Sequence, residues 1–580
     1  MSDLKNKEVV NSTDPEVGDS YSVTHNEPLE SGSRWQRFKD SFKTMEDEEI
    51  DSSNMTDLEK AIAKTAKSPL HKSLKNRHLQ MIAIGGAIGT GLFIGSGGAL
   101  KTGGPAALLI GWGLVGTMIY ATVQALGELA VTFPISGAFN VYSTRFIDPS
   151  WGFAMGWNYA LQWLVVLPLE LVAASITIKY WNSHINPVAW VAIFYVLIVA
   201  INFFGVKGYG EAEFVFSFIK VVAVIGFIIL GIILNCGGGP QGGYIGGKYW
   251  HDPGAFANGF KGVCTVFVTA AFSFAGTELV ALASSESANP RKALPRATKQ
   301  VFWRITLFYI ISLTLIGLLV PYTDERLGQG SYNAAASPFV IAIRNAGISG
   351  LPSVINVVIM IAVLSVGNSS VFGCSRTITS LAAQGFAPSF FTFVDRKGRP
   401  IFAVLLSLFV GLLCFVSASD KQGDVFDWLL ALSGLSSVFT WGSACFAHIR
   451  FRAALKHQGR DPHTELAYTS QCGVIGSWYG FILNVLILIA QFWVAAFPLK
   501  SKSTADGFFK SYLAFPVVIA FYIFHKIWKK NWRLYVKVSE MDLDTGRAEH
   551  DLELLKVEIA EEKAYIASKP FYYRAYRFWC

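Results

Sequence analysis

The stretch "IAIGGAIGTGLFIGSGGAL", Ile82 to Leu100, is long and apolar enough to cross a membrane, yet it is rich in glycine. Each glycine inside a helix costs about 0.5–1 kcal/mol relative to alanine. Two explanations are open: the glycines let neighbouring helices approach closely in lipid, or the helix is interrupted. Packing accounts for Gly95 to Gly98, whereas a polar Thr90 between Gly89 and Gly91 favours an interruption. The glycines of the stretch are Gly85, Gly86, Gly89, Gly91, Gly95, Gly97 and Gly98.

The composition of the whole chain identifies its class. Of its 580 residues, 52% are hydrophobic and only 16% are charged. The apolar residues form runs of about 20, the length that crosses a hydrocarbon core about 30 Å thick. Twelve such runs predict an all-α integral membrane protein with twelve transmembrane helices. They centre near Ile88, Tyr120, Trp163, Val196, Val224, Phe272, Leu313, Ile361, Phe409, Val438, Leu486 and Val518.

The positive charges gather in alternate connections between these runs, which predicts the orientation. Cytoplasmic loops of membrane proteins are enriched in Lys and Arg, so both termini are expected to be cytoplasmic. The first run follows about 80 polar residues, so we expect no amino-terminal signal peptide. The net charge of +8 therefore says little about nucleic acid, and the expected partners include membrane lipids and no nucleic acid. The clusters are Lys72, Lys75 and Arg77; Arg291 to Arg304; Arg376 to Arg399; and Arg450 to Arg460.

The chain divides into a core and two tails. Residues 1–79 have the polar composition of a disordered regulatory tail, and residues 80–529 form the twelve-helix core. Within the core, repeat one covers about 80–235, repeat two about 263–450, and helices 11–12 about 477–529. Residues 530–580 form a second cytoplasmic tail with a short helix and the ending FWC. This aromatic and basic ending is either a frayed end or an interfacial anchor with Cys580 available for acylation.

The sixth run resembles the first in being rich in small residues. It reads "FVTAAFSFAGTELVALASSES", Phe267 to Ser287, and follows five runs after the first. Inverted-repeat transporters place one discontinuous helix in each half, next to the substrate site near the membrane midplane. Runs 1 and 6 are thus interpreted as the broken helices of two five-helix repeats, with runs 11 and 12 outside. A continuous sixth helix with a small-residue face remains the alternative.

A broken helix in lipid leaves backbone N–H and C=O groups unpaired. Each unpaired group costs several kcal/mol unless a polar group pairs with it. An amino acid zwitterion supplies both complements. Its carboxylate suits the N–H groups at the start of a half-helix, here Gly89, Thr90 and Gly91. Its ammonium suits the freed carbonyls at the ends of the preceding half-helices, which are those of Ala87, Ile88, Phe272 and Ser273.

Four ionisable residues lie within the predicted membrane core: Glu128, Glu170, Lys220 and Glu278. Such residues cost at least about 2.5–3.5 kcal/mol, so each is a candidate functional residue. Glu128 could equally sit at the membrane boundary, and Glu170 with Lys220 could form a structural ion pair. A fixed ammonium at Lys220 can take the place of a sodium ion, while Glu170 and Glu278 can exchange protons. The sequence therefore favours proton coupling and predicts no metal site.

Four motifs resemble the fungal amino acid permeases of the amino acid–polyamine–organocation superfamily, most closely their broad-range members. They are "LKNRHLQMIAIGGAIGTGLF" (Leu74 to Phe93), "FGVKGYGEAEFVFSFIK" (Phe204 to Lys220), "FVTAAFSFAGTELV" (Phe267 to Val280) and "ALSGLSSVFTWGSACFAHIRFR" (Ala431 to Arg452). The resemblance runs from about Trp35 to Cys580. It implies a leucine-transporter-type fold with a 5+5 inverted repeat, plasma-membrane location and proton-driven uptake of L-amino acids.

The resemblance also implies roles for single residues. Ile88, Gly89, Thr90 and Gly91 would hold the substrate backbone, and Phe272, Ser273 and Phe274 would complete the site, with Phe274 as an aromatic lid. Thr277 and Glu278 would lie beside the pocket, and Lys220 would replace sodium. Lys5 and Lys7 are candidate ubiquitin acceptors for a ubiquitin ligase, and Cys580 resembles a palmitoylated cysteine.

The leading hypothesis is a proton-coupled symporter for a broad range of L-amino acids. A permease of narrow specificity and a non-transporting amino acid sensor are the alternatives. We expect no enzyme, because the sequence contains no phosphate-binding glycine loop, nucleophile elbow or zinc-ligand spacing. No cofactor other than protons as the coupling ion is expected.

Overall fold

The computed structural model describes residues 33–44, 55–66, 70, 74–86, 88–181, 185–287, 290–328, 337–418, 422–499, 502–548, 557, 560–561 and 564–574. Four predicted site residues, Lys5, Lys7, Ala87 and Cys580, lie outside these ranges. The chain divides into two units, residues 1–43 and residues 44–580. The first contributes one described helix, α1 (Arg34–Asp40), and the following sections concern the second.

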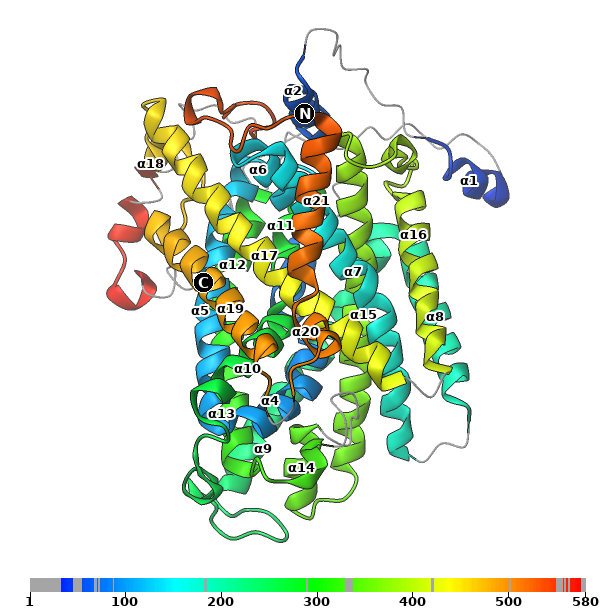
Figure 1. Ribbon diagram of the computed structural model, residues 1–580, viewed down its shortest axis with the longest axis vertical. Helices are drawn as coiled ribbons and strands as arrows, with labels where there is room; N and C mark the ends of the chain where they lie inside the picture. The colour runs from blue at the N-terminus through cyan, green and yellow to red at the C-terminus, as the bar shows by residue number, and fades with distance from the viewer. Residues whose placement is uncertain are drawn as a thin grey trace, which may run out of the picture. The chain divides into compact units, whose positions relative to one another are not determined.

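The second unit is helical (Figure 1). The described residues contain no strand, only two isolated β-bridges. Its α-helices are α2 (Asp57–Ala66), α3 (Asn76–Gly85), α4 (Ser96–Gly103), α5 (Pro105–Thr132), α6 (Ala138–Phe146), α7 (Pro149–Ile178), α8 (Pro187–Phe203), α9 (Gly205–Asn235), α10 (Gly259–Phe274), α11 (Leu279–Leu282), α12 (Pro290–Trp303), α13 (Ser312–Leu319), α14 (Pro338–Asn345), α15 (Leu351–Ala383), α16 (Ile401–Gly411), α17 (Gln422–His457), α18 (Pro462–Glu465), α19 (Gly473–Ala496), α20 (Ala505–Tyr512) and α21 (Ala514–Lys529). Wider π-helical turns occur at η1 (Gly91–Gly95), η3 (Trp250–Gly254) and η5 (Arg304–Ile311).

Eight helical segments of the described chain are long and apolar enough to cross a membrane. A ninth results if α20 and α21, bent by 70° at their junction, count as one span. The other predicted runs correspond to shorter helices: α8, α16, and the pair α3 and α4 with η1 between them. The eight segments are Pro105–Thr132, Pro149–Trp181, Gly205–Asn235, Gly259–Glu286, Ala293–Leu319, Leu351–Ala383, Trp428–His457 and Gly473–Ala496.

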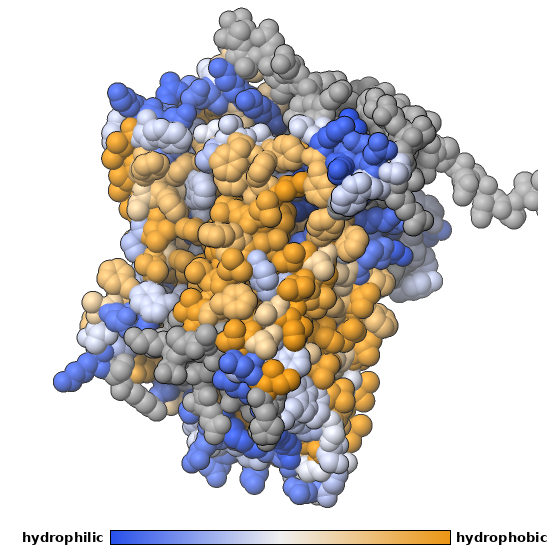
Figure 2. Space-filling view, turned by 90° about the vertical axis from the view of Figure 1, so that its right-hand side faces the viewer, coloured by the Kyte–Doolittle hydropathy of each residue, from blue (hydrophilic) through white to orange (hydrophobic). Residues whose placement is uncertain are grey.

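An apolar surface surrounds the helices. Figure 2 shows a hydrophobic band across one face, with hydrophilic residues gathered at its two ends. Exposed residues of this kind include Val196 on α8, Phe409 on α16 and Ile489 on α19, which are 64%, 70% and 59% exposed. Contiguous apolar surface of this size is unfavourable in water, so the band is the part of the protein that contacts lipid.

The buried helix α7 is the structural centre of the bundle. Its start is capped by the Asp148 carboxylate, which accepts hydrogen bonds from the backbone N–H groups of Ser150 and Trp151, both at 3.1 Å. It packs along α15, and a glycine of α15 makes room for a large side chain of α7. A Cβ on Gly373 would lie only 3.1 Å from Trp163 Nε1. Such small residues let two membrane helices approach closely, which brings α7 side chains to the middle of the molecule.

Two helices are interrupted, at the places where runs 1 and 6 are predicted to break. Helix α3 ends at Gly85, and continuous helix resumes only at Thr90. Helix α10 ends at Phe274 and is followed by Gly276, whose φ of +95° lies in the region that glycine favours. A Cβ on Gly276 would lie 3.5 Å from the carbonyl oxygen of Gly86, so the two interruptions are adjacent.

The glycines of the first run also have the packing role that was the alternative explanation. A Cβ on Gly85 would lie 2.2 Å from Ser217 Oγ, and one on Gly91 would lie 2.5 Å from Ser273 Cα. Neither position has room for any side chain. Interruption and close packing therefore occur together in this run, and packing is tightest at residues that flank the break.

Two arginines that the sequence places in loops lie instead inside helical segments. Arg304 belongs to the span Ala293–Leu319 and is 1% exposed. Arg376 belongs to α15, is 4% exposed, and donates from Nε to Glu286 Oε1 at 2.8 Å. The prediction of a loop position was wrong for both, because the last arginine of one basic cluster (Arg304) and the first of another (Arg376) lie within the adjoining helical segments and find buried acceptors there.

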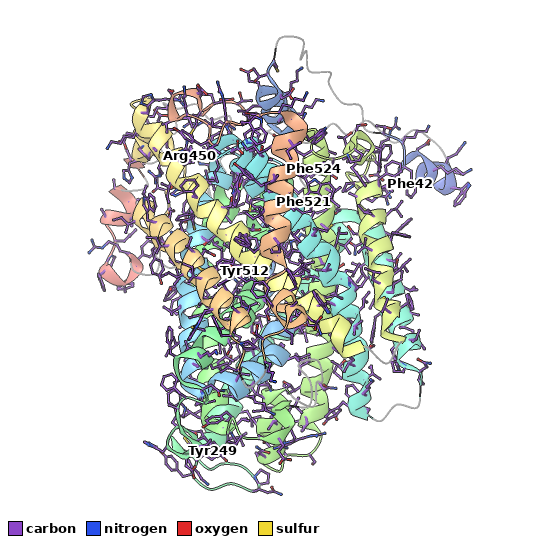
Figure 3. All side chains as sticks on the ribbon, viewed as in Figure 1. Phe42, Tyr249, Arg450, Tyr512, Phe521 and Phe524 are labelled. Carbon is purple, nitrogen blue, oxygen red and sulfur yellow. The ribbon has the colours of Figure 1, made fainter. Side chains whose placement is uncertain are left out.

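The segment after α21 folds back onto the end of the bundle that carries α6. Arg450 on α17 (Figure 3) donates from Nε to Phe146 O at 2.6 Å and from Nη2 to Val536 O. Arg145 on α6 donates from Nε to Asp542 O at 2.6 Å. Arg145, which is buried, and Arg450, which is partly buried, thus attach residues 536–548, the tail clamp, through backbone carbonyls.

Candidate functional site

A small cavity lies beside the two interruptions. Three of its residues come from α7, one each from α10 and α15, and the rest from the interrupted segments. It is lined by Gly89, Thr90, Gly91, Trp163, Val166, Glu170, Phe272, Ala275 and Val366. The structure therefore brings together five residues predicted from sequence, Gly89, Thr90, Gly91, Glu170 and Phe272. Trp163, Val166, Ala275 and Val366 are additional, and nothing in their apolar sequence context distinguishes them from core residues.

Glu170 is the only ionisable residue among the described residues that line this cavity. Thr90 Oγ1 donates a hydrogen bond to its Oε2. Its other oxygen, Oε1, is buried and has no hydrogen-bond partner among the described residues. Buried polar atoms are nearly always paired, so this oxygen is suited to accept a proton or to receive a donor from a ligand.

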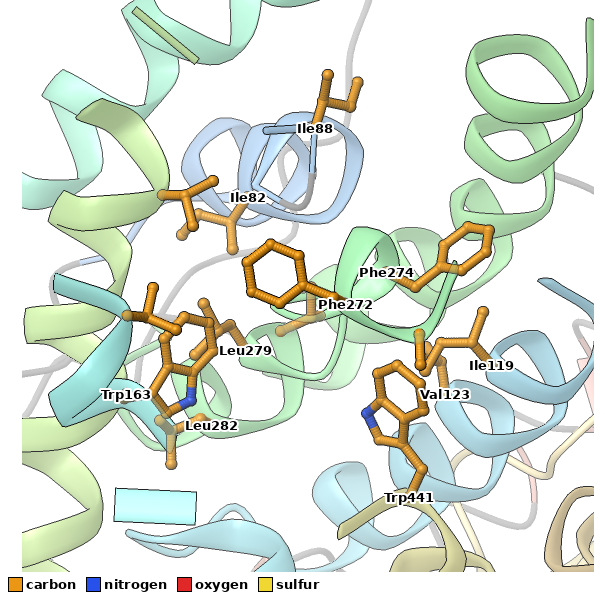
Figure 4. Close-up of a cluster of buried hydrophobic side chains, with 14 of the residues drawn as sticks. Ile82, Ile88, Ile119, Val123, Trp163, Phe272, Phe274, Leu279, Leu282 and Trp441 are labelled. Carbon is orange, nitrogen blue, oxygen red and sulfur yellow. The ribbon is translucent and has the colours of Figure 1, made fainter. Parts of the chain in front are cut away.

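Phe272 and Phe274 point in opposite directions from the end of α10 (Figure 4). Phe272 is turned toward Ile82 and Trp163 and lines the cavity. Phe274 is fully buried and packs on Tyr309, with ring centroids 4.4 Å apart. Residues two apart on a helix lie about 200° apart around its axis. Phe272 therefore lines the cavity and Phe274 does not, while the lid role expected of Phe274 stays a prediction.

Ile88 and Ser273 are buried beside the cavity but do not line it. The N–H of Ile88 donates to Gly85 O at 3.0 Å, which forms the turn at the interruption. The Ser273 carbonyl, predicted to be free for an ammonium, accepts a hydrogen bond from the Tyr309 hydroxyl at 2.8 Å. The first N–H groups of a helix have no intrahelical partner, so the half-helix that starts at Thr90 remains the polar end facing the cavity.

Glu278 joins the second interruption to two other helices. Its carboxylate accepts hydrogen bonds from Gly276 N at 3.2 Å, Tyr159 Oη at 3.1 Å and Trp441 Nε1 at 3.2 Å. Trp441 lies on α17 (Figure 4). Glu278 and Thr277 line a second small cavity rather than the first. Seven of the predicted site residues therefore line one or the other of these two cavities.

Arg304 connects the two interrupted helices. Its Nη1 donates to the carbonyl of Ala83 on α3, and its Nη2 donates to Thr277 Oγ1 in the second interruption. A buried guanidinium that satisfies backbone and hydroxyl acceptors fixes their relative position. The sequence analysis missed this role, although the apolar residues that flank Arg304 on both sides would have indicated burial.

Lys220 has a partner that the sequence analysis also missed. Its Nζ lies 3.4 Å from Glu213 Oε1 and donates to Ser365 Oγ at 2.8 Å. Ser365 in turn donates to Glu213 Oε2 at 2.7 Å, and Ser217 donates to Glu213 Oε1 at 3.0 Å. The alternative of an ion pair between Lys220 and Glu170 is replaced by this pair within α9. A seven-residue spacing, two helical turns on one face, is the signal that could have identified it.

Glu128 is part of a separate buried cluster. It lies 3.0 Å from His448 Nε2 and 2.6 Å from Arg452 Nε, and it accepts from Ser470 N at 2.7 Å. These contacts join α5 to α17 and to the segment before α19, so Glu128 has a structural role. Within the described ranges, no group of three or more His, Cys, Asp or Glu side chains could hold a metal ion.

A multi-spanning helical membrane protein with a buried, polar cavity between two interrupted helices has the architecture of a membrane transporter. Comparison with known proteins supports this class. A model of the amino acid permease family matches residues 78–538. The chain belongs to the amino acid permease family, whose members are transporters and not enzymes.

Three relatives illustrate the similarity. The general amino-acid permease GAP2 of Candida albicans is 63% identical, over 100% of this chain and 99% of the relative. The general amino-acid permease GAP1 of Saccharomyces cerevisiae is 64% identical, over 95% of this chain and 92% of the relative. The histidine permease of Saccharomyces cerevisiae is 54% identical, over 94% of this chain and 90% of the relative.

Proposed function

We propose that the chain is a proton-coupled symporter that imports a broad range of L-amino acids across the plasma membrane by alternating access. The observation that carries the proposal is the cavity in which Gly89, Thr90, Gly91, Glu170 and Phe272 meet beside two interrupted helices. The names of two relatives as general amino-acid permeases support the broad range. The proposal includes twelve transmembrane helices. Ten of them form a leucine-transporter-type 5+5 inverted repeat, and two lie outside the repeat.

The substrate is bound through its backbone. Its carboxylate pairs with the N–H groups at Gly89–Gly91, where the dipole of the half-helix is positive. Its ammonium faces the carbonyl groups freed at the interruptions, Ala87 and Ile88 among them, and the free oxygen of Glu170. Phe272 covers the side chain with an apolar surface, which discriminates weakly between side chains and suits a broad range.

Protons are the coupling ions, and Glu170 and Glu278 are their acceptors. The direct hydrogen-bond donors to both carboxylates are neutral groups: Thr90 for Glu170, and Gly276, Tyr159 and Trp441 for Glu278. Lys220 has a different task, because Glu213 already balances its charge. Its ammonium joins α9 to Ser365 on α15 and takes the position of a sodium ion.

Both termini are cytoplasmic in this proposal. Lys5 and Lys7 receive ubiquitin from a ligase, and Cys580 is palmitoylated and attaches the tail to membrane lipids. The tail clamp and α6 then lie at the cytoplasmic end of the bundle.

Uptake of labelled L-amino acids by cells that lack their own permeases tests the function. We expect uptake of neutral, basic and acidic amino acids that is abolished by a protonophore. Uptake of one side-chain class would indicate a narrow permease; one relative, 54% identical, is named a histidine permease. No uptake by protein confirmed at the surface would overturn transport and favour a sensor, and uptake insensitive to the protonophore would overturn the coupling.

A further inference from the structure

We infer that the proton bound at Glu278 leaves toward the cytoplasm along the hydroxyl groups of Thr298 and Tyr468, by a route separate from the substrate cavity. This inference rests on the proposed proton coupling. Glu278 does not line the cavity that contains Glu170. It lines a second cavity between α5, α11 and α12 instead.

The second cavity has apolar walls and polar ends. Its polar residues are Thr277, Glu278 and Thr298, and the others are Val123, Leu126, Gly127, Val280, Ala281 and Leu294. It has room for about one water molecule, and a buried water needs two to four polar partners. The carboxylate of Glu278 and the hydroxyl groups of the two threonines supply them. A water here would connect Glu278 to Thr298.

Beyond the cavity, a second hydroxyl continues the route. Thr298 Oγ1 lies 3.3 Å from Tyr468 Oη, and either hydroxyl can be the donor. Thr298 is 2% exposed, whereas Tyr468, on the segment that joins α18 to α19, is 9% exposed. Tyr468 also donates to Gln124 Oε1, which holds its hydroxyl in place. The exposure thus increases from Glu278, at 1%, to Tyr468.

The absence of a side chain at Gly127 keeps these groups together. A Cβ at this position would lie 2.7 Å from Thr298 Cγ2 and 3.3 Å from Tyr468 Cε1. Helix α5 therefore approaches both residues as closely as its backbone allows. Glu128, the residue after Gly127 on α5, is held by Arg452 and His448, so its carboxylate does not retain the proton.

The transfer balances at every step. The carboxyl group of Glu278 gives its proton to the water, and the water gives one to the Thr298 hydroxyl. Thr298 turns its O–H from Pro295 O, where it donates at 3.0 Å, and passes its proton to Tyr468, which turns its own O–H from Gln124 and releases one proton toward the solvent. Each hydroxyl receives one proton and loses one, so only Glu278 changes charge. The route needs hydroxyl groups at both positions, which makes it testable.

The test uses the full-length protein in liposomes that contain a pH-sensitive dye, with L-leucine as substrate, provided that the wild type transports it. Thr298→Val and Tyr468→Phe remove one hydroxyl each. We expect both to slow leucine-driven proton entry at least about tenfold, while leucine exchange at equal pH stays near the wild-type rate. Tyr120→Phe is the matched control, because its hydroxyl donates to Gln471 at 2.6 Å but lies off the route.

A second variant separates the hydroxyl from packing. Thr298→Ser keeps the hydroxyl and loses a methyl group, so proton entry should remain near the wild-type rate. Equal impairment of Thr298→Ser and Thr298→Val would overturn the route, as would normal proton entry in Thr298→Val or Tyr468→Phe. Leucine transport by the wild type without any proton entry would refute the proposed coupling itself, which distinguishes the two failures.

Discussion

Lys220 Nζ lies 3.4 Å from Glu213 Oε1, seven residues earlier on α9, and both side chains are fully buried. Ser365 on α15 donates to the carboxylate and accepts from the ammonium. The pair is therefore neutral as a unit and hydrogen-bonded to its surroundings, the condition under which a buried ion pair is tolerated. It joins α9 to α15 without leaving an unbalanced charge between the helices.

Glu213→Gln is predicted to destabilise the protein, because it leaves the Lys220 ammonium buried without its counter-charge. Removing one partner of a buried pair costs about 3–5 kcal/mol. We expect a lower thermal midpoint for the purified protein in detergent and less protein at the cell surface.

The double variant Glu213→Gln with Lys220→Met removes both charges. It should regain most of the thermal stability, whereas uptake should stay lost if the Lys220 ammonium has the proposed role in place of a sodium ion. If the double variant were no more stable than Glu213→Gln alone, the two charges would not be coupled.

Glu170→Gln is predicted to separate substrate binding from proton coupling. The amide has the shape of the carboxyl group and can still accept the hydrogen bond from Thr90, but it cannot take up a proton. Uptake against a concentration gradient should be lost, and the remaining uptake should no longer increase as the external pH falls. Exchange of internal for external substrate should continue. The measurement is labelled uptake between pH 4.5 and 7.5, together with counterflow.

Thr90→Ser is the control for this variant, because it keeps the hydroxyl donor, and it should retain the pH dependence of the wild type. Concentrative uptake by Glu170→Gln with an unchanged pH profile would exclude Glu170 as a proton carrier.

Phe272→Leu and Phe274→Leu are predicted to have different effects although the residues are neighbours. Phe272 lines the cavity, so its loss should raise KM about tenfold, equivalent to about 1.4 kcal/mol of binding. Phe274 packs on Tyr309, so its loss should lower thermal stability and leave KM nearly unchanged. Both are measured from concentration-dependent uptake and thermal unfolding. A larger change of KM in Phe274→Leu than in Phe272→Leu would show that Phe274 is the residue that covers the substrate.

The parts of this structure that could be predicted from sequence are those that the membrane imposes. The bilayer thickness sets the length of the apolar runs, and the cost of unpaired backbone in lipid makes the glycines of the first run informative. Gly89, Thr90, Gly91, Glu170 and Phe272 could thus be identified together, and they do share one cavity.

The remaining site residues depend on how the helices are rotated and paired. Phe272 and Phe274 have apolar neighbours on both sides, so the sequence contains no signal for which of them faces the cavity. Glu213 lies near the start of its run, where a carboxylate is ordinarily solvated, and only the packing of α15 encloses it. Thr298 and Tyr468 are far apart in sequence, and neither is unusual until the fold brings their hydroxyl groups within 3.3 Å.

Gly91→Ala is predicted to abolish uptake, whereas Gly98→Ala should be tolerated. A Cβ at Gly91 would lie 2.5 Å from Ser273 Cα, a backbone atom that cannot move without displacing α10. A Cβ at Gly98 meets nothing within 4 Å, and alanine stabilises a helix by about 0.5–1 kcal/mol relative to glycine. The uptake rate and the abundance at the cell surface are measured for both variants and compared with those of the wild type. Normal uptake in Gly91→Ala would show that the two interrupted helices need not be in contact during transport.

The tail clamp is predicted to stay attached when the pH of the surrounding solution falls from 7 to 5. Arg460 Nη1 and Nη2 lie 2.6 and 2.8 Å from the two oxygens of Asp544, and this hydrogen bonding holds the pKa of the Asp544 carboxyl below its ordinary value. Because the pKa of Asp544 is lower in the folded than in the unfolded protein, the stabilisation that its carboxylate gives to the tail clamp is fully present above the unfolded pKa, about 3.9. It is lost only as the pH falls through the lower, folded value.

Hydrogen exchange of residues 536–548, corrected for the intrinsic effect of pH, measures the attachment. Protection should be constant from pH 8 to pH 5 and fall only below about pH 4. Asp544→Asn should reduce protection at pH 7 by less than about 1 kcal/mol, because the pair is exposed to solvent. Arg145→Met should reduce it more, since this buried side chain holds the backbone carbonyl of Asp542 at 2.6 Å. Release of the segment between pH 7 and pH 5 would show that a group other than these aspartates controls the tail clamp.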